Sequence, residues 1–179
     1  MDNFKLKTIK DFPKPGVNFI DINPLLQNPA QFSKAVEDFC AQIPAEELRR
    51  AAIITPEARG FLFAAPVAYK LGLPLLLIRK KGKIPNAPHS FHVTNEYTDC
   101  DMEVDADLLS RYNRFIYIDD ILATGQTLAS VRQALQTLGK EIVLALHFAA
   151  VEALKKMRES NPALKGLPSH VIFRGKNEK

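Results

Sequence analysis

The sequence predicts an α/β fold in which a central, mostly parallel sheet carries helices on both faces. The first observation is an alternation: short apolar runs typical of buried strands are separated by segments whose apolar residues recur every three or four positions. The second is size, because 179 residues with 46% apolar content suffice for a sizeable core. We therefore expect residues 1–179 to form a single domain.

The elements can be taken in order along the chain. Asn28 followed by Pro29, with Gln31 two positions further on, is a typical helix start, and a first helix is expected from there to about Cys40. Apolar runs of strand length predict strands at 51–55, 75–78, 115–118, 142–148 and 171–173. Helical spacing predicts further helices at 60–71, 128–138 and 151–158.

Residues 79–110 interrupt this alternation with charge, proline and an expected hairpin that pairs 91–93 with 102–104. A long insertion in a compact domain is usually a lid or a binding loop. The segment after about residue 150 contains no motif that indicates a role.

The most informative segment is 115–127, where a buried strand leads into an acidic pair and a turn. The turn opens a helix, whose N-terminus presents unpaired N–H groups and the positive end of its dipole, and Gly125 lets an anion approach closely. The adjacent Asp119 and Asp120 can accept hydrogen bonds from the vicinal hydroxyls of a ribose. The segment thus predicts a ligand that is both sugar and phosphate. The simpler interpretation is that Thr124 or Thr127 caps a helix and the acids are solvated.

Three segments should converge, because ligands of open α/β sheets bind outside the carboxyl ends of the strands. Residues 55–59, 79–83 and 119–127 each follow an expected strand. Arg59 lies in the first turn of a helix, where its charge opposes the dipole and an anionic ligand would relieve the conflict. The alternatives are an arginine turned to a surface carboxylate and, for 79–83, a solvated basic turn.

The same segments resemble type I phosphoribosyltransferases, and among them the enzymes acting on adenine. Residues 115–127 resemble the signature for phosphoribosyl diphosphate (PRPP), and 11–22 resemble the N-terminal signature of the adenine enzymes. Residues 58–63 resemble their pyrophosphate loop, and 78–85 with 95–97 their mobile catalytic loop. The resemblance implies the type I phosphoribosyltransferase fold, with an N-terminal hood at about 1–28 and a mobile catalytic loop at about 79–110.

The resemblance implies a pentosyltransferase of purine salvage that converts adenine and PRPP to AMP and pyrophosphate. The catalytic residues it implies are Glu96, Arg59, Asp119 and Asp120. The PRPP and phosphate site comprises Asp119, Asp120, Ala123, Thr124, Gly125, Gln126 and Thr127. The pyrophosphate site comprises Ala58, Arg59, Lys80 and Lys83. Val17 and Phe19 would enclose the purine, although by periodicity alone both could be core residues. Mg²⁺ is the implied cofactor, held by PRPP and water with no direct protein ligand.

Base choice depends on Ala123 and Glu96. Phosphoribosyltransferases of 6-oxopurines typically carry an aspartate at the position of Ala123, whereas Glu96 matches the loop glutamate of the adenine enzymes. The family usually has serine at Ala58, glycine at Gln126, arginine at Ile20 and glycine at Thr98. A xanthine or other 6-oxopurine enzyme remains open, as does a non-catalytic PRPP-binding regulator. A phosphatase is disfavoured, because Ile121 stands where its second carboxylate would be. The resemblance also implies a non-proline cis peptide, with Ala58–Arg59 as the candidate bond.

Composition argues against several other classes of protein. The net charge of +4 is spread along the chain, so no nucleic-acid stripe is indicated. The longest apolar stretch, 142–151, is too short to span a bilayer, and no signal segment is evident, so we expect a cytoplasmic protein. Cys40 and Cys100 are expected to be free thiols. The four histidines, His89, His92, His147 and His170, show no metal-ligand pattern. The resemblance implies a homodimer.

Overall fold

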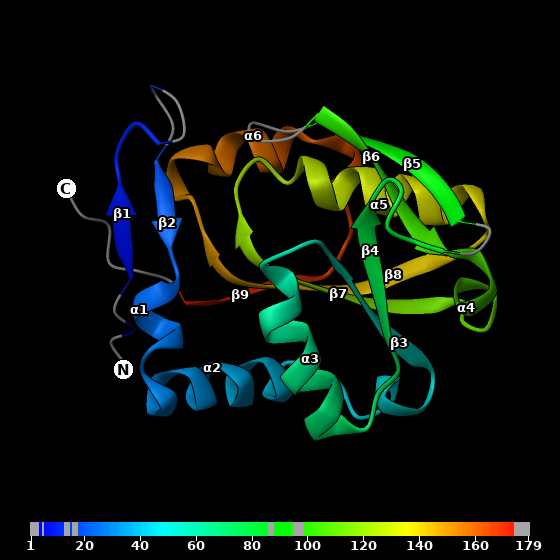
Figure 1. The fold of residues 1–179 in the computed structure, drawn as a ribbon, viewed down its shortest axis with the longest axis horizontal. Helices are drawn as coiled ribbons and strands as arrows, with labels where there is room; N and C mark the ends of the chain where they lie inside the picture. The colour runs from blue at the N-terminus through cyan, green and yellow to red at the C-terminus, as the bar shows by residue number, and fades with distance from the viewer. Residues whose placement is uncertain are drawn as a thin grey trace.

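A seven-stranded sheet forms the centre of the computed structural model, which describes residues 4, 6–12, 15, 18–85, 88–94 and 99–173 (Figure 1). The strands lie in the order β5-β6-β4-β3-β7-β8-β9. Their bounds are β3 Ala51–Pro56, β4 Leu75–Lys80, β5 Pro88–Thr94, β6 Asp99–Asp105, β7 Arg114–Leu122, β8 Glu141–Ala150 and β9 Ser169–Phe173. β4, β3, β7, β8 and β9 run parallel, whereas β6 pairs antiparallel with both of its neighbours, β4 and β5. The predicted α/β class with a mostly parallel sheet is confirmed.

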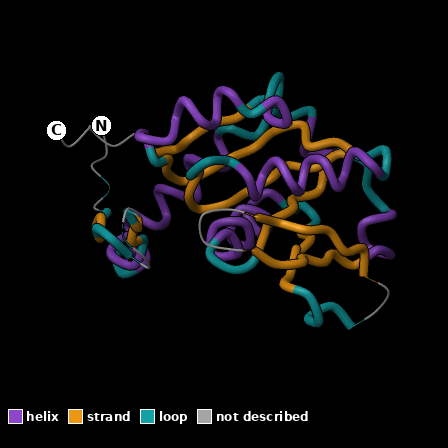
Figure 2. The backbone as a smooth tube through the Cα atoms, turned by 90° about the horizontal axis from the view of Figure 1, so that it is seen from above, coloured by secondary structure: helices purple, strands orange, loops and turns teal. Residues whose placement is uncertain are grey.

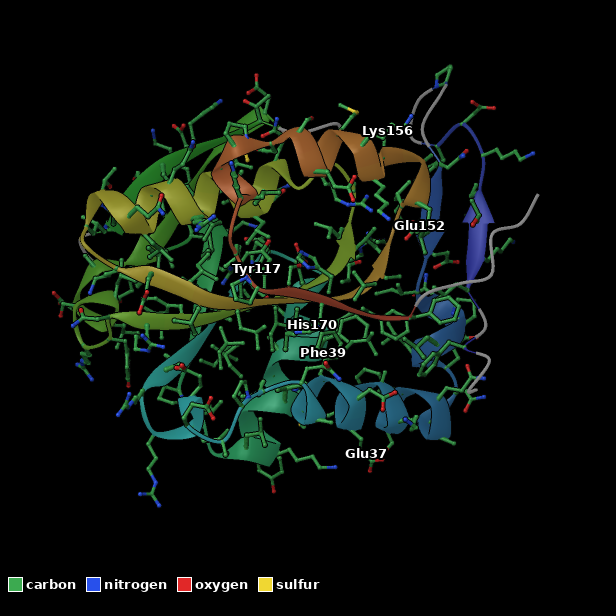
Figure 3. All side chains as sticks on the ribbon, turned by 180° about the vertical axis from the view of Figure 1, so that it is seen from behind. Glu37, Phe39, Tyr117, Glu152, Lys156 and His170 are labelled. Carbon is green, nitrogen blue, oxygen red and sulfur yellow. The ribbon has the colours of Figure 1, made fainter. Side chains whose placement is uncertain are left out.

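Helices cover both faces of this sheet (Figures 1 and 2). α2 (Pro29–Ala41) and α3 (Gly60–Leu71) enclose one apolar core, whereas α5 (Gln126–Thr137) covers the other face and α6 (Lys155–Ser160) lies on the same side as α5. Phe39 belongs to the first core and Tyr117 to the second, and Figure 3 shows them on opposite sides of the sheet. The short helices are α1 Asn23–Leu26, α4 Ala106–Ser110 and the 3₁₀ turns η1 Glu47–Arg49, η2 Glu152–Leu154 and η3 Pro162–Leu164.

Local chemistry explains where these helices begin and end. The Asn28 side chain accepts a hydrogen bond of 3.1 Å from the Gln31 N–H, and Pro29 occupies the first helical position, so α2 starts as predicted. The helix expected at 151–158 begins later. The Val151 N–H is bonded to the Leu122 carbonyl, which keeps Val151 extended at the end of the sheet. A 3₁₀ turn then precedes α6.

β7 is longer than the sequence predicts, and this changes the setting of the acids. Asp119 and Asp120 were expected beyond the strand, but β7 continues to Leu122 because β8 pairs alongside it up to Ala150. Asp119 is thereby fixed opposite His147 of β8. The two carboxylates therefore sit on a rigid strand rather than on a loop.

A separate strand pair and the β5–β6 hairpin of the main sheet border the carboxyl ends of its parallel strands. β1 (Lys7–Ile9) and β2 (Phe19–Asp21) form an antiparallel pair that stands beside the main sheet in Figures 1 and 2. The predicted hairpin is present as β5 and β6, but its register differs from the expected pairing of 91–93 with 102–104, because Phe91 lies opposite Met102 and Val93 opposite Cys100. Val17 and Glu96, to which the sequence assigns roles, lie outside the described residues. Among the helices that the structure describes, none has the length and apolar content needed to cross a membrane.

Candidate active site

A cavity of about 360 Å³ lies at the carboxyl ends of β3, β4 and β7. The β1–β2 unit, the β3–α3 loop, the β5–β6 hairpin and the β7–α5 turn all contribute to its walls. Its lining includes these residues with assigned roles: Phe19, Ala58, Arg59, Lys80, Asp119, Asp120, Ala123, Thr124, Gly125, Gln126 and Thr127. The structure thus brings together the segments expected to converge.

The β7–α5 turn, residues 123–127, has the backbone of an anion-binding turn. Gly125 is the N-cap of α5 and has a φ of 81°, a left-handed backbone conformation that residues other than glycine rarely adopt. α5 starts at the next residue, and the residues of its first turn, Gln126 to Leu128, line this end of the cavity. Thr124 is buried, and its hydroxyl has no hydrogen-bond partner among the described residues. The Thr124 hydroxyl is therefore available to a ligand at the N-terminal, positive end of the α5 dipole.

The acidic pair is held in a network that leaves part of its charge uncompensated. Asp119 accepts hydrogen bonds of 3.0 Å from the Tyr117 hydroxyl and 2.9 Å from the Asp120 N–H. Burial and the neighbouring Asp120 raise the pKa of Asp119 well above its ordinary value. Burial also raises the pKa of Asp120, although the nearby Arg59 opposes this. A ligand with hydroxyl donors would favour the ionised form of both carboxyls.

Arg59 joins three parts of the site. Its Nε lies 2.6 Å from Oδ2 of Asp120, and a terminal nitrogen donates to the Ile20 carbonyl at 3.1 Å. The guanidinium carbon lies 4.8 Å from the centre of the Phe19 ring. The resemblance assigns Arg59 to pyrophosphate, but here it contacts the acid assigned to ribose. The non-proline cis peptide is Glu57–Ala58, so the expected bond, Ala58–Arg59, was wrong by one position.

Glu57 is a site residue that the sequence analysis missed. Its carboxylate accepts hydrogen bonds from Lys83 Nζ at 2.5 Å, Arg79 Nε at 3.0 Å and the Lys80 N–H at 3.1 Å. Burial works to raise the pKa of Glu57, but these bonds outweigh it and lower the pKa to about 2. The acid thereby holds the basic segment 79–83 against the β3–α3 loop. An acidic residue directly after a strand, facing an expected basic cluster, was the available signal.

His147 is the second residue that was missed. It lines the cavity, is only 1% exposed and lies beside the Tyr117 ring at 5.5 Å between centroids. Burial and the positive charge of Arg158 lower its pKa to about 3, so the ring is neutral near pH 7. The available signal was topological rather than a motif, because parallel pairing of β7 and β8 sets His147 opposite Asp119.

Unpartnered polar atoms concentrate at this site. Among buried side chains of the described residues, Thr55 Oγ1, Thr124 Oγ1 and His147 Nδ1 have no hydrogen-bond partner, and Asp120 Oδ2 has only its ion pair with Arg59. Thr124, His147 and Asp120 line the cavity. Buried polar atoms are nearly always bonded in folded proteins, so this concentration indicates a polar ligand. Fold and site together define an α/β protein with a polar ligand cavity at the carboxyl edge of its sheet.

Comparison with known proteins identifies the family. The model of the phosphoribosyl transferase domain matches residues 23–168, and the chain belongs to that family. It is 38% identical to an adenine phosphoribosyltransferase of Carboxydothermus hydrogenoformans over 83% of this chain and 88% of that protein. It is 43% identical to one of Ureaplasma parvum over 71% of this chain and 72% of that protein.

Solved structures agree with this assignment. An adenine phosphoribosyltransferase of Giardia lamblia, complexed with 9-deazaadenine, superposes with a TM-score of 0.82 at 27% identity, over 96% of this chain and 94% of that one. One from Thermoanaerobacter pseudethanolicus gives a TM-score of 0.78 at 29% identity, over 93% and 94% of the two chains. The type I phosphoribosyltransferase fold expected from the sequence is confirmed.

Proposed function

We propose that this protein is an adenine phosphoribosyltransferase, which converts adenine and PRPP to AMP and pyrophosphate. The single observation that carries the proposal is the placement of a paired acid, Asp119 and Asp120, beside an anion-binding turn in a cavity with unsatisfied polar atoms. The named activity of relatives at 38% and 43% identity supports adenine as the base. Ala123 also supports it, because it supplies no carboxylate for the proton of a 6-oxopurine.

The site residues divide among the parts of the substrates. The turn 123–127 would bind the 5-phosphate through backbone N–H groups and the Thr124 hydroxyl. Asp119 and Asp120 would accept hydrogen bonds from the ribose hydroxyls. Ala58, Arg59, Lys80 and Lys83 would bind pyrophosphate. Phe19, with Val17, would enclose the adenine ring. The Phe12 ring packs edge-to-face against the Phe19 ring, with 5.4 Å between their centroids, and so orients the Phe19 ring.

In the proposed reaction a purine nitrogen bonds to C1 of the ribose while the bond from C1 to pyrophosphate breaks. The electron pair of the broken bond leaves with pyrophosphate, and the purine nitrogen loses its proton. Positive charge grows on the sugar in the transition state, where Asp119 and Asp120 supply negative potential. Arg59, Lys80 and Lys83 supply positive potential to the leaving group. Glu96 is proposed as the acid–base group at the purine.

Mg²⁺ is proposed as the cofactor. Oxygens of PRPP and water would supply its ligands, as is common for Mg²⁺ bound together with phosphates. Asp119 and Asp120 are the nearby carboxylates that fit such a shared site, through water. When bound, the ion would neutralise the charge of the leaving pyrophosphate.

We also propose a single-domain protein that acts as a homodimer in the cytoplasm. The gel-filtration mass of the purified protein tests the dimer.

A panel of labelled bases tests the activity. The protein is incubated with PRPP and Mg²⁺ and with adenine, hypoxanthine, guanine, xanthine or orotate in turn, and the nucleotide product is separated. We expect AMP from adenine and little product from the other bases. Product from xanthine or hypoxanthine alone would reassign the base, and PRPP binding without any product would indicate a regulator.

A further inference from the structure

The C-terminal segment packs directly against the proposed phosphate turn. A Cβ atom added to Gly125 would lie 2.6 Å from Leu164 Cδ1 and 3.8 Å from Arg158 Cγ. Leu164 belongs to η3 and Arg158 to α6, and α6 lies next to α5 in Figure 1. The part of the chain without any sequence motif thus forms one wall of the turn.

Arg158 binds the backbone of this turn through one nitrogen. Its terminal Nη1 donates to the Val151 carbonyl at 2.7 Å and the Ala123 carbonyl at 2.9 Å, and it lies 3.4 Å from the Leu122 carbonyl. These three carbonyls belong to the last residue of β7, the first residue of the turn and the residue that follows β8. A single side chain therefore ties the two strand ends together beneath the phosphate turn.

The bond to Ala123 has a consequence for the neighbouring donor. In a trans peptide the C=O and the following N–H point in opposite directions. When the Ala123 carbonyl points to Arg158, the Thr124 N–H must point away from Arg158, and Thr124 lines the cavity. Rotation of this peptide would instead turn a carbonyl oxygen, which repels anions, toward the cavity. Arg158 opposes that rotation.

The guanidinium also brings positive charge to the turn. Burial lowers the pKa of Arg158, whereas Glu152 and Glu159 oppose this, and an arginine side chain in a protein stays protonated. Since the charge stands behind the turn, it adds to the field of the α5 N-terminus without contacting an anion there. The same charge acts on the buried His147 ring.

We propose that Arg158 is a positioning residue for the 5-phosphate of PRPP and AMP, which fixes the Ala123–Thr124 peptide so that its N–H faces the phosphate. The proposal rests on the proposed function, since it assumes that the turn binds this phosphate. Leu164 assists by filling the space beside Gly125.

The contribution of the 5-phosphate to affinity is measured by calorimetry, from the dissociation constants of adenosine and of AMP. The ratio of the constant for adenosine to that for AMP reports what the 5-phosphate adds to affinity. Arg158→Met should lower this ratio by about tenfold or more, the scale of a lost charged hydrogen bond, and leave adenosine affinity unchanged. Arg158→Lys should restore part of the ratio, because an ammonium group also offers several donors at one nitrogen. A merely structural role would lower Tm and leave the ratio as in the wild type.

Lys156→Met is the matched control, because it removes the same charge from an exposed position of the same helix (Figure 3). It should leave the ratio unchanged. If Arg158→Met does not fold, Leu164→Ala replaces it and should lower the ratio about threefold, since it removes packing but no hydrogen bond. An unchanged ratio in the variant that folds would overturn the inference. A wild-type protein that does not bind AMP would instead overturn the proposed function.

Discussion

Arg59 and Asp120 form an ion pair with 2.6 Å between Nε and Oδ2, where the β3–α3 loop meets β7. The proposed function assigns the arginine to pyrophosphate and the acid to ribose. Binding of PRPP would therefore replace this pair by two sets of contacts with the substrate. The pair holds the two groups about where their ligand partners are needed, which limits the ordering cost of binding.

Removal of Arg59 should destabilise the folded protein, because it leaves the buried Asp120 carboxyl without its ion-pair partner. Arg59→Ala leaves a carboxyl with 7% side-chain exposure uncompensated, and we expect a loss of about 2 kcal/mol in the free energy of unfolding, less than for a fully buried pair because Arg59 is 36% exposed. Urea denaturation at pH 7 measures this. Adding Asp120→Asn should recover most of the loss, and a double variant no more stable than Arg59→Ala would refute the coupling.

Glu57 predicts a dependence of stability on pH. Its pKa is about 2 in the folded protein against an ordinary 4.5, so its contribution is fully present above pH 4.5 and is lost as the pH falls toward 2. Glu57→Gln should lower the free energy of unfolding at pH 7 by about 1–3 kcal/mol, the lower values reflecting the exposed partner Lys83. Denaturation curves from pH 6 to pH 3 should show a shallower decline in the variant. Parallel declines would contradict the proposed linkage.

His147 predicts a second loss of stability on acidification, at higher pH. In the unfolded chain the His147 imidazole is protonated below its ordinary pKa of 6.5. In the folded protein it stays neutral until the pH falls to about 3. Stability should therefore fall across this window by at most about 1.4 kcal/mol per pH unit. His147→Gln should remove that component. His170→Gln, which removes an exposed imidazole from β9 (Figure 3), is the control and should not remove it.

Gly60 is predicted to be required for activity, because its surroundings leave no room for a side chain. A Cβ atom there would lie 2.5 Å from Thr55 Oγ1, 2.8 Å from Asp119 Oδ1 and 3.2 Å from the Ile118 carbonyl. Gly60→Ala should displace Asp119 and lower kcat/KM for PRPP by about tenfold or more. Gly72→Ala is the control, because Gly72 has a φ of 66° but no atom lies within 4 Å of a Cβ added there. It should lower Tm and leave kcat/KM unchanged, and equal effects on kcat/KM would contradict the steric explanation.

Much of the fold could be predicted from the sequence, because hydrophobic periodicity and helix-capping residues are local features of the chain. The Asn28 cap, the β5–β6 hairpin and the helix after Gly125 all depend on residues close in the chain. The length of β7 was underestimated because pairing with β8, not the residues of β7, extends it past the acids. The resemblance located the segment with the cis peptide but not the bond.

The site was only partly predictable, for a different reason. The acids and the turn form one continuous segment, so they could be recognised together. The bonds of Glu57 to Lys83 and of Arg158 to Ala123 join residues 26 and 35 positions apart, and no local pattern encodes such contacts. The roles of Glu96 and Val17 stay predictions, since both lie outside the described residues.

The rate of AMP formation by a protein carrying both Asp119→Asn and Asp120→Asn tests the central claim most directly. Burial already disfavours the charged form of both carboxyls, so neutral amides of the same shape should leave the fold intact, which circular dichroism verifies. If the two acids bind the ribose and stabilise its positive charge, kcat/KM for PRPP should fall by about 10²-fold or more. A folded double variant with the wild-type kcat/KM would contradict the account.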